Sequence, residues 1–141
     1  MFVYEKRLQY PVNIKNPNPK LAAAIVSQYG GPDGELGASL RYLSQRYSMP
    51  YPELKGLLTD IGTEELGHLE MVGAIVHQLT RKMSDSQIQD SAFAPYFVDH
   101  TVGVYPTAAS GFPWSAASMA VKGDPITDLT EDLAAAAANQ S

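Results

Sequence analysis

Glu65 and His68 lie three residues apart in the run TEELGHLEMVGAIV at 63–76, whose apolar residues recur with the period of a helix. Side chains at i and i+3 share one helical face, one turn apart. Ile61 precedes Glu65 by four residues and Val72 follows His68 by four, so the acid and the imidazole interrupt an apolar stripe. An unpaired buried carboxylate is costly, and a divalent cation compensates because it binds ionised Glu and neutral His. The pair is therefore a candidate metal site, to be weighed against the solvated face or single internal hydrogen bond that Glu-x-x-His usually makes.

Glu35 is a second candidate, because it directly follows the glycine-rich run GGPDG at 30–34. Small residues flank it on both sides, which lets another backbone or a ligand approach closely. Ser39 and Tyr42 follow on the same face, at i+4 and i+7. Taken alone, Glu35 is explained as a first-turn acid favoured by the helix dipole.

Together these residues form half of a ligand pattern. A carboxylate-bridged two-metal site in a four-helix bundle takes one Glu from each of two helices and Glu-x-x-His from each of the other two. This chain carries one Glu at position 35 and one Glu-x-x-His about 30 residues later. Oxygen and nitrogen donors of this kind suit manganese or iron. From the ligand set alone, iron is not excluded.

Other acids and imidazoles are given no part in the site. Glu64 and Glu70 lie off the apolar face, and we expect both to be solvated. His77 lies about half a helical turn round from His68 and is expected to be exposed and neutral to substitution. His100 falls in a predicted loop, where a lone histidine is usually solvated.

Helices must position the candidate residues. Asn18 followed by Pro19 is a capping residue before a proline at the first helical position, and it predicts a helix over 18–48 that the glycine-rich run kinks or interrupts. A second helix is predicted over 52–82, a rod of roughly 45 Å at 1.5 Å per residue. Its apolar stripe comprises Leu54, Leu57, Leu58, Ile61, Leu69, Val72, Ile75, Val76 and Leu79.

The rest of the chain is predicted to be less regular. Residues 1–17 read as an extended arm, and residues 85–124 as a long loop rich in Gly, Pro, Ser and aromatics. Because aromatic residues argue against disorder, we expect this loop to be ordered and to wrap the bundle or a neighbouring subunit. A third helix is expected to start at 125–138, where it passes into five consecutive alanines. The expected fold is all-α, with 1–141 as a single domain.

Composition excludes several classes of function. The chain has 141 residues and a net charge of −5, and its basic residues never cluster beyond adjacent pairs, so no nucleic-acid partner is expected. There is no cysteine, so any metal is held by Asp, Glu and His. The first residues lack the apolar region of a signal peptide, and no run of about 18 apolar residues predicts a membrane span. We therefore expect a protein made in the cytoplasm, with no membrane partner.

Three long segments are LQYPVNIKNPNPKLA, QYGGPDGELGASLRYLSQRYSMP and LTDIGTEELGHLEMVGAIVHQL, and they are followed by YFVDHTVGVYP and AVKGDPITDLTEDLA. These segments resemble the manganese catalase family, most closely its spore-coat branch. The resemblance implies a ferritin-like four-helix bundle whose dinuclear manganese centre disproportionates hydrogen peroxide to water and oxygen. It also implies a homo-oligomer in the spore coat or cytoplasm of a spore-forming bacterium, with other coat proteins as further partners.

The same resemblance assigns roles to individual residues. Glu35 and Glu65 match the family's two bridging carboxylates, and His68 matches a terminal imidazole ligand. These three are thus the expected catalytic and metal-binding residues. Tyr42 matches a tyrosine that hydrogen-bonds near the metals.

The sequence departs from the family pattern in its last residues. The family continues with a third helix that carries another Glu ligand and a fourth that carries a final His; here alanine, Ala136 by count, stands in the third-helix position. Three interpretations stay open: a piece of a longer catalase subunit, two copies that complete the site across a twofold axis, or a structural coat protein with a vestigial or incomplete metal site whose loop 85–124 locks subunits together.

Overall fold

All regular elements in the described part of the chain are helices. The computed structural model describes residues 3–96, 108–112, 115–119 and 121–138. The α-helices are α1 (Pro19–Gly30), α2 (Glu35–Gln45), α3 (Pro52–Thr80), α4 (Asp85–Gln89) and α5 (Pro125–Ala138). Short 3-10 turns occur at Arg46–Ser48, Ala94–Tyr96 and Ala116–Ser118. None of the helices in these ranges is long and apolar enough to cross a membrane.

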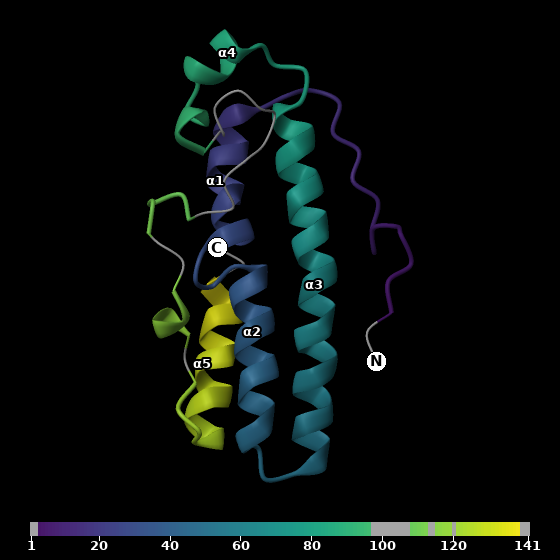
Figure 1. Ribbon diagram of the computed structural model, residues 1–141, viewed down its shortest axis with the longest axis vertical. Coiled ribbons are helices and arrows are strands. Elements are labelled where there is room, and N and C mark those ends of the chain that lie inside the picture. The colour runs from purple at the N-terminus through teal and green to yellow at the C-terminus, as the bar shows by residue number, and fades with distance from the viewer. Residues whose placement is uncertain (1–2, 97–107, 113–114, 120, 139–141) are drawn as a thin grey trace.

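α1 and α2 stack end to end, and α3 runs antiparallel to both along their full length (Figure 1). α5 lies beside α2 and runs antiparallel to it (Figure 1). The sequence predicted a helix over 18–48 that is kinked or interrupted at the glycine-rich run, and the structure has two helices separated by residues 31–34. The interruption arises because Gly31 and Gly34 both adopt extended backbone, so the chain makes a turn here and does not bend as a continuous helix.

The start of α1 is fixed by the predicted cap. The Asn18 side chain accepts a hydrogen bond from the backbone N–H of Leu21, with Pro19 at the first helical position. The backbone N–H of Asn18 also donates to the carbonyl of Leu79, at 2.8 Å. The beginning of α1 is therefore tied to the end of α3, which sets the two helices side by side.

Two separate apolar clusters hold the helices together. One joins α1, the end of α3 and the following loop, and consists of Ala22, Val26, Val76, Leu79 and Phe93. The other joins α2 and the start of α3, and consists of Ala38, Tyr42, Met49 and Leu58. Leu57 was predicted on the apolar stripe but is 52% exposed, so that prediction is wrong. Glu65 lies in sequence between Leu58 of one cluster and Val76 of the other, and Glu35 lies between Val26 and Ala38.

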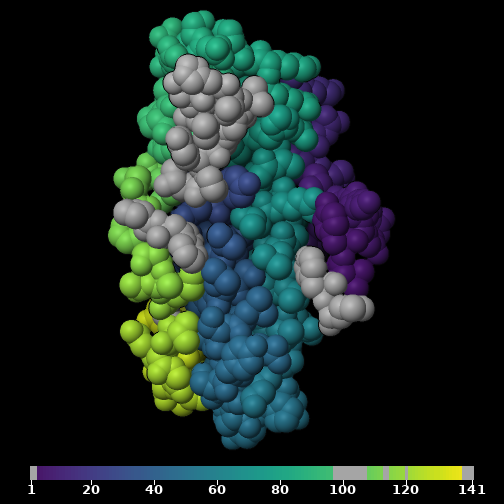
Figure 2. Space-filling view, in the orientation of Figure 1, coloured from purple at the N-terminus to yellow at the C-terminus, as the bar shows by residue number. Residues whose placement is uncertain are grey.

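The N-terminal arm, described from residue 3, lies against the outer side of α3 (Figures 1 and 2). Both ends of the Gln78 amide bond the arm at residues 12–14, because its Nε2 donates to the Val12 carbonyl and its Oε1 accepts from the Ile14 N–H. Arg81 donates to the Ile14 carbonyl at 3.0 Å. Backbone groups of the described arm thus bond to side chains at the end of α3 and directly after it, without forming a strand.

Two described parts of the 85–124 loop, around Phe93 and Ala109, pack against α1. The backbone N–H of Ala109 donates to the Ser27 hydroxyl, and the Tyr96 hydroxyl donates to the Ala109 carbonyl. Phe93 is fully buried, and its ring centroid lies 5.4 Å from that of Tyr96. The expectation for His100 falls outside the described residues.

Phe93 is expected to be a main contributor to stability, although it belongs to the predicted loop. Phe93→Ala should lower the free energy of unfolding by about 3–5 kcal/mol, because it leaves a cavity in the α1–α3 cluster. The control is Phe112→Ala, which removes a ring that is about half exposed and should cost less than about 1 kcal/mol. Urea unfolding followed by circular dichroism measures both. Equal losses in the two variants would contradict the buried position of Phe93.

Candidate metal centre

Glu35, Glu65 and His68 lie together, as the sequence predicted. One ligand atom from each lies within 4.8 Å of the others. The Nδ1 of His68 is 2.7 Å from Oε2 of Glu65 and 3.8 Å from Oε2 of Glu35. Glu35 comes from the first turn of α2, and the other two come from the middle of α3. The site therefore spans the contact between the two helices.

The turn before α2 determines where Glu35 lies. Gly37 has no side chain, and a Cβ there would collide with the Pro32 carbonyl oxygen, so the turn folds back closely over the first turn of α2. The buried guanidinium of Arg41 bonds Asp33 at 2.8 Å, which ties the turn to the body of α2. Glu35, the first residue of α2, is thus fixed in place because the turn before it is bonded to the helix that follows.

The two carboxylates are mostly shielded from water, with side chains 17% exposed for Glu35 and 16% for Glu65. Burial raises the pKa of Glu35 to about 7, the neighbouring Glu65 adds to this, and His68 opposes it. Two acids this close resist carrying charge together. A divalent cation removes that conflict, and two carboxylates with one imidazole are donors that bind such a cation well. The residues present therefore fit a metal.

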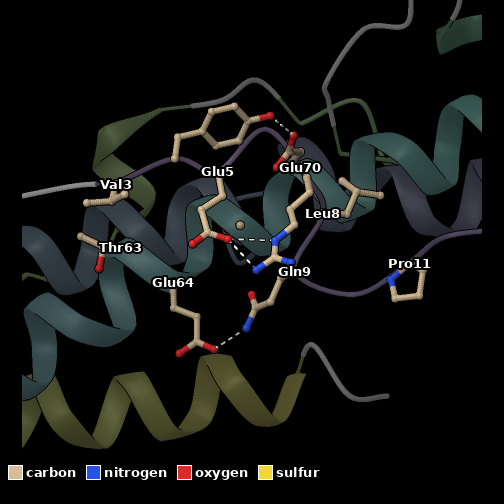
Figure 3. Close-up of a pocket in the computed structure, with 11 residues that line it drawn as sticks. Val3, Glu5, Leu8, Gln9, Pro11, Thr63, Glu64 and Glu70 are labelled. Atoms are coloured by element: carbon tan, nitrogen blue, oxygen red, sulfur yellow. Dashed lines mark hydrogen bonds and ion pairs between the residues drawn. The ribbon is translucent and has the colours of Figure 1, made fainter.

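The His68 ring points Nδ1 at the two carboxylates and Nε2 towards Glu64. Oε1 of Glu64 is 3.8 Å from Nε2 and accepts a 3.0 Å hydrogen bond from the Gln9 amide of the arm (Figure 3). The sequence predicted a solvated Glu64 without a part in the site. Its side chain is indeed about half exposed, and its carboxylate lies between the Gln9 amide of the arm and the far side of the imidazole. Its position four residues before His68 was the signal available.

A groove opens between the arm and α3 beside this link (Figure 3). Its walls carry Glu5 and Arg7 from the arm and Glu64 and Glu70 from α3. Glu70 accepts a 2.6 Å hydrogen bond from the Tyr4 hydroxyl, so this acid is not simply solvated either. The groove is lined by both polar and apolar side chains, and none of the three gathered ligand residues lines it.

Tyr42 lies in the α2–α3 apolar cluster and is buried. Burial raises the pKa of its hydroxyl, and the nearby Glu65 and Asp132 act in the same direction. The ring is therefore close enough to the site to feel its charge. The hydrogen bond near the metals that the resemblance implies for Tyr42 stays a prediction.

A buried polar group between α2 and α5 was missed by the sequence reasoning. Arg41 and Gln45 face α5, and Asp132 on α5 is only 8% exposed. Burial raises the pKa of Asp132 to about 6, while Gln45 and Arg41 act to lower it. The i, i+4 spacing of Arg41 and Gln45 was a visible signal, but nothing in the sequence paired it with α5.

The burial pattern of α5 bears on Ala136, which by count stands in the position of the family's third-helix Glu. Asp128, Asp132 and Ala135 are buried, whereas Ala136 is exposed. Ala136 lies four residues after Asp132, so it is close to the same face of α5 although its side chain is exposed.

Comparisons with known proteins decide the family. Residues 1–140 match the family model described as manganese containing catalase. The chain belongs to this family. The resemblance inferred from the sequence is confirmed, and so is the all-α, ferritin-like fold: the crystal structure of KatB, a manganese catalase from Anabaena, superposes with a TM-score of 0.85 at 32% identity.

The similar proteins are longer than this chain. Protein CotJC of Bacillus subtilis is 49% identical over 135 residues, which cover 96% of the chain and 71% of CotJC. A probable manganese catalase of Clostridium acetobutylicum is 34% identical, covering 95% of the chain and 60% of that protein. The KatB match covers 99% of the chain and 62% of KatB. The chain thus spans about two thirds of the length of these relatives.

Glu35 is expected to make the metal-free protein less stable as the pH rises. Its folded pKa of about 7 exceeds the ordinary value of 4.5. Between these values the folded state holds a proton that the unfolded state has lost, so the free energy of unfolding falls with rising pH, by about 2 kcal/mol after allowance for partial exposure. In Glu35→Gln this part of the decline should disappear. Urea unfolding of chelator-treated protein at about pH 5 and about pH 8 measures it.

Glu53→Gln, a change at an exposed first-turn acid of α3, is the matched control and should leave the wild-type decline intact. A decline of equal size in wild type and Glu35→Gln would show that position 35 titrates as an ordinary carboxyl.

Proposed function

We propose that this protein binds manganese at Glu35, Glu65 and His68 and disproportionates hydrogen peroxide to water and oxygen. The observation that carries the proposal is the gathering of two shielded carboxylates and one imidazole within 4.8 Å, in a chain of the manganese-containing catalase family. KatB, the solved structure to which the chain is similar, is a manganese catalase. The donor set alone also permits iron, and elemental analysis distinguishes the two.

Each residue has a distinct part in this proposal. Glu35 and Glu65 come from facing helices, and their two carboxylates would hold the metal from both sides of the helix contact. His68 offers Nδ1 on the side of the carboxylates, while its Nε2 lies 3.8 Å from Glu64 on the other side. When bound, a pair of manganese ions supplies the redox chemistry by which one peroxide is oxidised and another reduced. The chain contributes the ligands, their spacing and the shielding from bulk water.

A complete two-metal site of this class needs two Glu residues and two Glu-x-x-His pairs. The described residues supply one Glu and one Glu-x-x-His pair, so a second of each is needed. The remaining ligands then come either from further residues of the same polypeptide or from a second copy of this chain across a twofold axis. A homo-oligomer satisfies the second route directly, since an isologous interface presents the same residues twice.

A second function is that of a structural component of the spore coat, with peroxide chemistry secondary or absent. The 49% identity to protein CotJC of Bacillus subtilis supports it. The two proposals share a location in the spore coat or cytoplasm. They differ in whether the natural protein contains stoichiometric metal.

Elemental analysis of protein isolated without added chelator tests the metal site. We expect about two manganese ions per complete four-helix unit. Glu65→Ala and His68→Ala should each lose most of the metal and of the peroxide-dependent oxygen evolution, because each removes a ligand. His77→Ala removes an exposed imidazole from the same helix and should keep both.

Metal-free protein that still assembles into particles would overturn the catalytic proposal and leave the structural one. Intact mass of the natural protein, compared with 15.3 kDa for this sequence, decides the source of the missing ligands. A mass well above that value excludes the route through two copies of this short chain.

A further inference from the structure

One hydrogen bond crosses directly between α2 and α3, a single turn away from both carboxylates. The Ser39 hydroxyl, only 1% exposed, donates to the carbonyl oxygen of Gly62 at 2.6 Å. Ser39 lies one turn after Glu35 on α2. Gly62 lies three residues before Glu65 on α3. The bond therefore joins the two helices beside the point where their carboxylates meet.

The two helices are also in close contact here because Gly62 has no side chain. A Cβ at this position would lie 2.8 Å from Cγ of Leu43 and 3.2 Å from Cβ of Tyr42. Both distances are shorter than carbon atoms tolerate without moving. The backbone of α3 thus rests against side chains of α2, and a larger residue would push the helices apart.

The Ser39 bond is not required by the helices themselves. The Gly62 carbonyl lies inside α3, where the helical ladder already offers it an N–H partner four residues on. A serine inside a helix commonly bonds a carbonyl of its own preceding turn. Here the hydroxyl bonds the neighbouring helix instead. Unlike apolar packing, this bond has a length and a direction, so it restricts how α2 slides and rotates against α3.

That restriction acts on one ligand in particular. Glu65 and His68 lie on the same helix, so the fold of α3 alone fixes their spacing. Glu35 lies on the other helix, and its distance from them depends on the α2–α3 contact. Metal ligands have to be held within about 0.5 Å of their binding geometry.

We propose that Ser39, acting with Gly62, is a positioning residue that sets the distance between Glu35 and the Glu65–His68 pair. This inference rests on the proposed metal site. It assigns to Ser39 no contact with metal or peroxide, and its effect is exerted through the spacing of the two helices.

The test compares Ser39→Ala with Thr80→Val. The Thr80 hydroxyl is also buried and donates to a carbonyl, that of Val76, but within α3 and fifteen residues beyond Glu65. Both variants lose one buried hydroxyl, so both should lose thermal stability in the metal-free state. Only Ser39→Ala should weaken manganese binding, raising the Kd about tenfold in a titration of chelator-treated protein followed by Mn²⁺ electron paramagnetic resonance.

A second readout needs no metal. Because the chain has no cysteine, spin labels can be attached at Ser44→Cys on α2 and Asp60→Cys on α3, both exposed positions. In the metal-free protein, Ser39→Ala should broaden or lengthen the label-to-label distance, and Thr80→Val should leave it unchanged. If Ser39→Ala does not fold, Ser39→Cys, read by Mn²⁺ titration alone, weakens the donor at nearly constant volume and should shift the Kd in the same direction.

A Ser39→Ala protein whose Kd lies within twofold of wild type, with an unchanged label distance, overturns the proposal. Equal changes in Ser39→Ala and Thr80→Val would also overturn it, because they would reflect general loss of stability. Failure of the wild-type chain to bind manganese would overturn the proposed function instead. In that case, the label distance in metal-free protein alone supports or refutes the role of Ser39 in helix spacing.

Discussion

The structure depends on holding two carboxylates close together in a place that water hardly reaches. Glu35 and Glu65 are both largely shielded, and their nearness raises the pKa of Glu35 to about 7. Such an arrangement is unfavourable for a protein without a cation, since neither charge is well solvated. Neighbouring contacts keep the two carboxylates from moving apart. The Arg41–Asp33 ion pair fixes the turn before Glu35, and apolar clusters lie on either side along the helices. Stability and cation binding therefore make opposite demands on the same few residues.

The sequence was sufficient to predict the elements that carry the site. The cap at Asn18, the proline starts and the 3.6-residue stripe of 52–82 each reflect local chemistry, and helices begin at Pro19, Pro52 and Pro125 in the structure. The gathering of Glu35 with Glu65 and His68 was also predictable. The spacing within one helix is fixed by geometry, and the Glu plus Glu-x-x-His pattern supplied the second helix.

Features that depend on contacts between helices were not predictable in this way. The burial of Asp132 near Arg41 and Gln45, the Gln9–Glu64 hydrogen bond and the Ser39–Gly62 hydrogen bond each bring together residues more than 20 positions apart. No periodicity within a single helix encodes such pairings. The prediction that placed Leu57 on the buried stripe was wrong for the same reason. A periodic stripe shows which residues share a helical face, but not which of them a neighbouring helix covers.

The turn at 31–34 has a consequence for how this chain tolerates change. Each residue inserted into a continuous helix rotates everything beyond it by about 100°. Because the turn separates α1 from α2 and is itself bonded to α2 through Asp33 and Arg41, a residue gained or lost in α1 does not alter the direction in which Glu35 points. A residue gained within α2 between Glu35 and Ser39 would rotate the acid away from α3. Insertions or deletions before the turn therefore leave the direction of the Glu35 side chain unchanged, whereas those in the first turn of α2 change it.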